Sequence, residues 1–70
     1  MRDDQETTEL RLALHHETGG AVLVSDDGDR ESAVWLPKSQ VRRGELVGSG
    51  LPRVYLWDVP VWLAEKEGLV

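Results

Sequence analysis

The stretch AVWLPKSQV, residues 33–41, decides the fold, because it is a short run of alternating apolar side chains that stops at a proline. Val34 and Leu36 would face one side of a strand and Trp35 the other. Pro37 cannot donate a hydrogen bond to a neighbouring strand, so it marks the end of the strand or an edge position. The polar residues that follow it predict an exposed turn.

The segment AVLVS, residues 21–25, predicts a second strand just upstream of this stretch. The acidic residues between the two segments are typical of a turn, because Asp side chains bond nearby backbone amides and Gly28 tolerates unusual backbone angles. We therefore expect the two strands to pair in antiparallel fashion across an acidic loop.

Residues 8–16, TELRLALHH, alternate apolar and polar side chains with the period of a half-buried strand. A helix remains the alternative, because Leu10 and Leu14 are also one helical turn apart and the residue types favour helices. Residues 1–7 show no apolar periodicity and predict a flexible acidic tail, which leaves residues 8–70 as a single small domain.

Downstream, residues 42–44 are expected to continue a loop, and residues 45–50, ELVGSG, to form a weak strand or loop. Residues 53–59, RVYLWDV, have the composition most typical of a strand in this chain. Val54 and Leu56 would line one face of that strand, and Tyr55, Trp57 and Val59 the other.

The C-terminal residues predict one short helix. Pro60 suits the first helical position, and Gly68 suits a left-handed helix end. Leu69 can then fold back on Leu63 or Ala64. A helix of about two turns is marginal on its own, so we expect Trp62 and Leu63 to pack against the sheet.

These elements predict a mainly β (α+β) protein. It would form a small antiparallel sheet of three to five strands, or a barrel-like fold, with one short C-terminal helix. SH3-like and OB-like barrels are the nearest familiar architectures. A chain of 70 residues buries only about 60% of its unfolded surface, so we also expect a homodimer.

The charge is concentrated in the first half of the chain. Residues 1–31 carry nine acidic and three basic side chains, whereas the remaining residues carry four and five, within a net charge of −5. This balance favours a basic partner over nucleic acid or an anionic membrane. No cysteine is present, and the start of the chain lacks the pattern of a signal peptide, so we expect a cytoplasmic protein with no membrane span.

No arrangement of residues predicts catalysis, a metal or a cofactor. The serines lie in no nucleophile motif, and the acidic loop fits neither register of a calcium-binding loop. His15 and His16 are adjacent, so on a regular strand they would point to opposite faces and could not share a metal ion without a bulge. We therefore expect a protein that is not an enzyme.

Two surfaces are candidates for binding. The predicted partner-binding residues are the carboxylates of the front half: Glu9, Glu17, Asp26, Asp27, Asp29 and Glu31. The aromatic residues expected at a dimer or other aromatic contact are Trp35, Tyr55 and Trp57, because tryptophan and tyrosine are enriched at interfaces. An alternative function, single-stranded nucleic-acid binding, would combine aromatic stacking with positive charge and use Trp35, Trp57, Lys38, Arg42 and Arg43. A third alternative is a structural or assembly subunit.

The string WLPKSQ and the C-terminal VPVWLAEKEGL resemble a family of short, uncharacterised phage and prophage proteins. The resemblance covers roughly residues 12–70. Val61 stands where the family more usually has an acidic residue, and the insertion at residues 44–52 is particular to this chain. The resemblance implies a fold and a mobile-element setting, and it implies no activity.

Phage proteins of this size and acidity resemble inhibitors of host defence, anti-CRISPR proteins among them. Several such inhibitors present carboxylates in place of DNA phosphates. The sequence hypothesis is therefore a noncatalytic, DNA-mimic-like inhibitor of a host nucleic-acid-binding complex such as a CRISPR effector.

Overall fold

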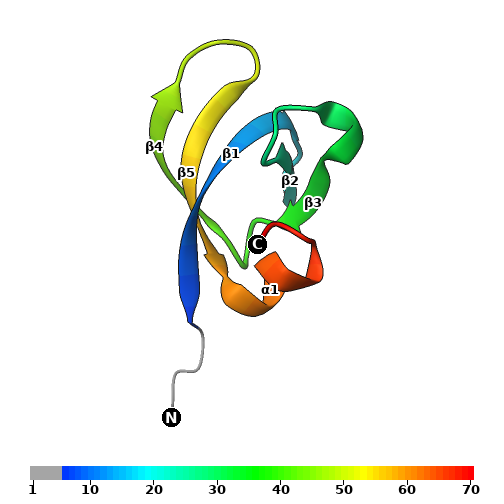
Figure 1. Ribbon diagram of the computed structural model, residues 1–70, viewed down its shortest axis with the longest axis vertical. Helices are drawn as coiled ribbons and strands as arrows, with labels where there is room; N and C mark the ends of the chain where they lie inside the picture. The colour runs from blue at the N-terminus through cyan, green and yellow to red at the C-terminus, as the bar shows by residue number, and fades with distance from the viewer. Residues whose placement is uncertain (1–5) are drawn as a thin grey trace.

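The computed structural model describes residues 6–70, which form one open five-stranded antiparallel sheet and one short C-terminal helix (Figure 1). The strand order is β3-β2-β1-β5-β4. The elements are β1 (Thr7–Glu17), β2 (Ala21–Ser25), the 3-10 helix η1 (Arg30–Ser32), β3 (Val34–Pro37), β4 (Arg42–Gly48), β5 (Arg53–Pro60) and α1 (Val61–Lys66). The predicted mainly β class is thus confirmed. The predicted tail, residues 1–7, lies mostly outside the described residues, and β1 begins at Thr7.

The central strand β1 is a strand along its whole length and not a helix. It pairs with β5 from Thr7 opposite Pro60 to Leu14 opposite Arg53, and with β2 on its other side. The predicted hairpin across the acidic loop also forms, since β2 and β3 pair in antiparallel register with Val22 opposite Leu36. The sequence thus predicted β1 as a strand and the pairing of β2 with β3, whereas the pairing of β1 with β5 is a finding of the structure.

The strand β4 corrects the sequence prediction, which had a loop through Gly44 and only a weak strand or loop after it. β4 pairs with β5, with two shifts of register along its length. A Cβ atom on Gly44 would lie 2.9 Å from the backbone oxygen of Leu56, so the glycine permits this close approach of the two backbones. β4 forms through backbone pairing, and its own residues show no apolar period.

The core draws on β1, β2, β3, β5 and α1. Its buried members are Leu12, Val22, Val24, Leu36, Trp57, Val59, Leu63 and Ala64. The indole Nε1 of Trp57 donates a hydrogen bond to the backbone oxygen of Leu12, 3.2 Å away. A buried indole N–H therefore has the partner that burial demands.

The helix α1 lies at one end of the sheet, next to the end of β5 (Figure 1). It begins at Val61, one residue later than predicted, because Pro60 is the last residue of β5 and occupies the N-cap position instead of the first helical position. The predicted ending is confirmed: Gly68 has a φ of 75°, and the Leu69 N–H donates to Ala64 oxygen at 2.8 Å, as in a Schellman motif.

One side chain of α1 departs from the prediction. Leu63 is buried as expected, but Trp62 is 47% exposed. The buried side of the helix is formed by Leu63 and Ala64. Successive residues on a helix point about 100° apart, so Trp62 points about 200° away from Ala64 and lies outside that side. No helix of residues 6–70 is long and apolar enough to cross a membrane.

Candidate binding site

A β-bulge at His15 shapes the end of β1. Leu14 lies opposite Val24 and His16 opposite Leu23, so β1 has one more residue than β2 at this point. The ring Nε2 of His15 lies 2.7 Å from the hydroxyl of Ser25, which is buried. The bulge is the condition under which two adjacent histidines can face one space, and both line the same cavity. Residues 6–70 contain no group of three or more side chains placed to hold a metal ion.

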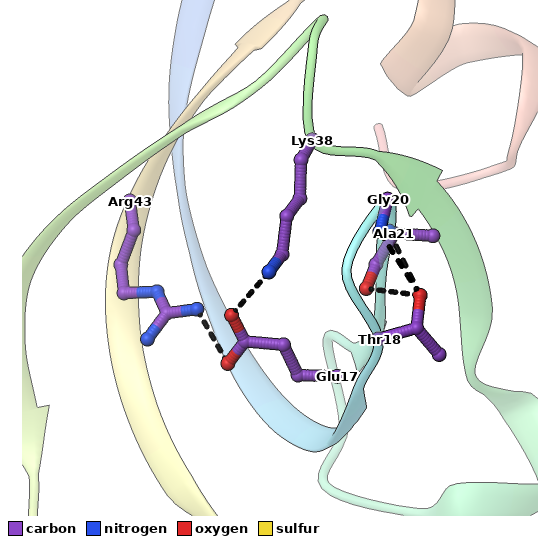
Figure 2. A network of polar contacts seen from close by, with 6 residues as sticks. All are labelled: Glu17, Thr18, Gly20, Ala21, Lys38 and Arg43. Carbon is purple, nitrogen blue, oxygen red and sulfur yellow. Dashed lines mark hydrogen bonds and ion pairs between the residues drawn. The ribbon is translucent and has the colours of Figure 1, made fainter.

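Directly after the bulge, Glu17 holds two cations from other parts of the chain (Figure 2). Its carboxylate oxygens lie 2.7 Å from Lys38 Nζ, in the turn after β3, and 2.8 Å from Arg43 Nη2, on β4. These two contacts lower the pKa of Glu17 from its ordinary value of 4.5 to about 2. We call these three residues the ionic clasp, because they connect the two edges of the open sheet.

The guanidinium of Arg43 is also placed over two aromatic rings. Its Cζ atom lies 5.0 Å from the centre of the Tyr55 ring and 5.3 Å from that of Trp57. The two rings meet edge to face, with their centres 5.9 Å apart. A cation over an aromatic face is attracted by the ring electrons, so the clasp and the rings fix the same side chain.

Beside the clasp lies a cavity of about 440 Å³, which we call the hairpin cleft. Its walls come from the end of β1, from β4, from the start of β5 and from the connection between β4 and β5. The lining residues that matter below are Leu14, His16, Arg43, Leu51, Arg53 and Tyr55. Leu51 is 95% exposed. The half-exposed ring of Trp35 meets His16 edge to face at 6.0 Å, which continues the aromatic surface beyond the cleft.

The acidic loop, residues 26–31, is ordered by its own hydrogen bonds. One oxygen of Asp27 accepts from the Asp29 N–H at 2.9 Å and from the Ser32 hydroxyl at 2.7 Å. Asp29 in turn accepts from the Glu31 N–H at 2.9 Å and caps η1. The bond from Ser32, with the backbone bond from Asp29, lowers the pKa of Asp27.

The structure separates the six predicted partner-binding carboxylates into three places. The acidic loop holds Asp26, Asp27, Asp29 and Glu31. Glu17 belongs to the ionic clasp, and its charge is balanced by two cations. Glu9 lies on β1 opposite Asp58, which in turn lies opposite Arg42. Only the loop group forms a contiguous set.

The three predicted aromatic contact residues also lie in different environments. Trp57 is buried, Tyr55 is half-buried beneath Arg43, and Trp35 is half-exposed. The five residues of the nucleic-acid alternative therefore do not share one surface, because Trp57 is in the core and the clasp holds two of the cations.

Sequence reasoning missed the hairpin cleft. Arg53 and Tyr55 alternate on β5 and so share a face, which the period of a strand could have revealed. The apolar Leu51 next to Pro52 in a connection between strands was a second available clue. No protein-family model, curated protein or solved structure matches this chain.

Proposed function

We propose that this chain is a noncatalytic, phage-type binding protein that acts in the cytoplasm. Its acidic loop docks on the basic nucleic-acid channel of a host complex, such as a CRISPR effector, and inhibits it. The observation that supports the proposal is the acidic loop itself, where four carboxylates occur within six residues and two of them, those of Asp27 and Asp29, order the loop through local hydrogen bonds.

The order of the loop matters because a preformed surface has less conformational entropy to lose on binding. The loop's carboxylates are exposed, and Arg30 is the one basic residue among them. Such a patch steers association with a positively charged channel and disfavours partners of the same sign. The hydrogen bonds from Ser32 and from the Asp29 backbone lower the pKa of Asp27 and so favour its ionised form.

The experiment separates charge from loop structure. The variant Asp26→Asn with Glu31→Gln removes two charges and leaves the carboxylates of Asp27 and Asp29, which order the loop, in place. The matched control, Glu65→Gln with Glu67→Gln, makes the same change of net charge in the C-terminal region. Loading of labelled target DNA on purified, guide-bound CRISPR effector complexes is measured in the presence of each protein.

We expect the native protein and the C-terminal control to block DNA loading equally. The loop variant should need at least tenfold more protein for the same effect. If excess native protein leaves DNA loading unchanged on every complex tested, the proposal is wrong. Equal losses in the loop variant and the control would assign the effect to net charge alone.

A further inference from the structure

The hairpin cleft is independent of the acidic loop and has the opposite chemical character. It combines guanidinium groups, an aromatic ring and apolar side chains from β1, β4 and β5. Tryptophan, tyrosine and arginine are the residues most enriched at the energetic centres of protein interfaces, and all three types lie in the cleft or at its rim. Its volume of about 440 Å³ falls in the range of ligand-binding cavities.

We propose that the hairpin cleft is a second binding site, which takes a peptide segment of another protein that carries a carboxylate next to an apolar side chain. The carboxylate binds Arg53, and the apolar side chain packs between Leu14, Leu51 and the ring of Tyr55. This binding does not involve the acidic loop and does not depend on the function proposed above.

The charge of the occupant follows from the two arginines. The charge of Arg43 is balanced by Glu17 at 2.8 Å. Arg53 makes no ion pair within the part of the chain that the structure describes, and it is exposed at the start of β5. A planar guanidinium binds a carboxylate through two parallel hydrogen bonds. Among residues 6–70, the cleft therefore offers one arginine that makes no ion pair, and this guanidinium complements one carboxylate.

The number of arginines in the cleft that lack an ion pair also argues against the binding of a nucleic-acid strand there. A nucleic-acid groove needs a series of cations along the phosphate backbone, and here the other cation of the cleft is engaged. The protein carries a net charge of −5, which repels a polyanion more strongly than a single carboxylate. A short peptide with one carboxylate needs only one cation and is repelled less by the net charge of the protein.

The apolar part of the occupant follows from Leu51. This side chain is 95% exposed at the mouth of the cleft, although a leucine is normally found inside a fold. Leu14 and Tyr55, both half-buried, form the wall of the same cavity. An apolar side chain seated among these three would remove all of them further from water, which is favourable.

The wall of the cleft is also held in position before any ligand arrives. Arg43 is fixed by Glu17 and lies 5.0 Å above the Tyr55 ring, so neither side chain has to be ordered on binding. A site whose side chains are fixed by a supporting layer binds with less loss of entropy.

The test uses the full chain labelled with ¹⁵N and three eight-residue peptides. The first contains one Glu between two Leu residues. The second replaces that Glu with Gln, and the third replaces both Leu residues with Ser. The single-stranded oligonucleotide dT8 is the fourth probe. Titrations followed by NMR report both affinity and which backbone amides shift.

We expect the first peptide to shift the amides of His16, Leu51, Arg53 and Tyr55, and the other two peptides to bind at least tenfold more weakly. Arg53→Gln should abolish the preference for Glu over Gln in the peptide. Arg42→Gln is the matched control, because it removes the same charge from β4 at a position opposite Asp58 and outside the cleft. Both arginines are exposed, so both variants should fold.

Three results would overturn the proposal. They are no shift with the first peptide at millimolar concentration, an equal response to the Glu and Gln peptides, and a stronger response to dT8 at the same amides. The variant Asp26→Asn with Glu31→Gln should bind the first peptide as the native protein does. A failure of the acidic-loop proposal therefore leaves this result unaffected, and the two proposals can fail separately.

Discussion

The strands β2 and β4 both form antiparallel pairs, β2 with β1 and β4 with β5, but they differ in how many of their side chains are buried. β2 buries four of its five side chains, whereas none of the seven residues of β4 is buried. β2 also lies between two strands, whereas β4 is an edge strand that pairs with β5 alone among the strands of residues 6–70. The contrast shows that backbone pairing is sufficient to define a strand, but side-chain burial decides how much that strand stabilises the fold.

The largest expected effect on stability comes from replacing a valine by alanine, once in β2 and once in β4, and comparing the two losses. Val24→Ala in β2 removes two fully buried methyl groups and leaves a cavity, so we expect a loss of about 2 to 3 kcal/mol in the free energy of unfolding. Val47→Ala in β4 changes a side chain that is 38% exposed, and we expect a change within about 0.5 kcal/mol. Urea denaturation measures both. Equal losses would mean that β4 contributes to the core as β2 does.

The next effect concerns the position where β4 is sterically constrained. Gly44→Ala places a Cβ 2.9 Å from the Leu56 oxygen, so the two backbones must move apart. We expect a loss of about 1 to 2 kcal/mol in the free energy of unfolding. Gly50→Ala is the control, because a Cβ there meets no atom within 4 Å. If both glycines tolerate alanine equally, β4 is free to shift away from β5.

A smaller and more local effect is expected from the ionic clasp. Glu17→Gln keeps the size of the side chain but removes the charge that holds Lys38 and Arg43. Amide hydrogen exchange should become faster in β4 and stay unchanged in β2, because β4 lacks burial as a second source of stability. Faster exchange in both strands would contradict the separation of the two regions. An exposed ion pair contributes little, so the effect on global unfolding should be the smallest of the mutational series.

The pH dependence of stability also tests how much the ionic clasp contributes to the fold. The pKa of Glu17 is lowered from 4.5 to about 2, so its contribution is fully present above about pH 4.5 and is lost as the pH falls toward 2. The lowered pKa of Asp27 acts in the same direction. Thermal unfolding at several pH values should therefore show a shallower acid decline in Glu17→Gln than in the native protein. Identical declines would show that the clasp carries no acid-sensitive stability.

The sequence predicted the four strands that supply the core, but it gave β4 as a loop followed by a weak strand or loop, for one physical reason. The strands β1, β2, β3 and β5 supply apolar side chains to the core, so they could be recognised, β1 and β3 by alternation and β2 and β5 by their apolar composition. β4 faces no core, and its charged and glycine residues resemble a loop. Its conformation comes from β5, which no local pattern of residues records.

The candidate site also has a part that could be predicted from the sequence and a part that could not. The acidic loop could be predicted because Asp and Gly determine their turn locally. The ionic clasp joins Glu17 to residues 21 and 26 positions further along the chain, and the cleft depends on where β4 lies. Such contacts follow only from the three-dimensional pairing. Trp57 shows the same limit, because composition alone could not place this tryptophan in the core rather than at an interface.

The order of strands around the sheet also has a consequence for how the chain folds. Three of the four strand pairs join neighbours in the sequence, and only β1 and β5 join distant segments. The 38 residues between Leu14 and Arg53 must be brought into a closed loop before that pair forms, at an entropic cost of about 3 kcal/mol. We therefore expect this one closure to limit the rate of folding, with the β2–β3 and β4–β5 hairpins able to form earlier and on their own.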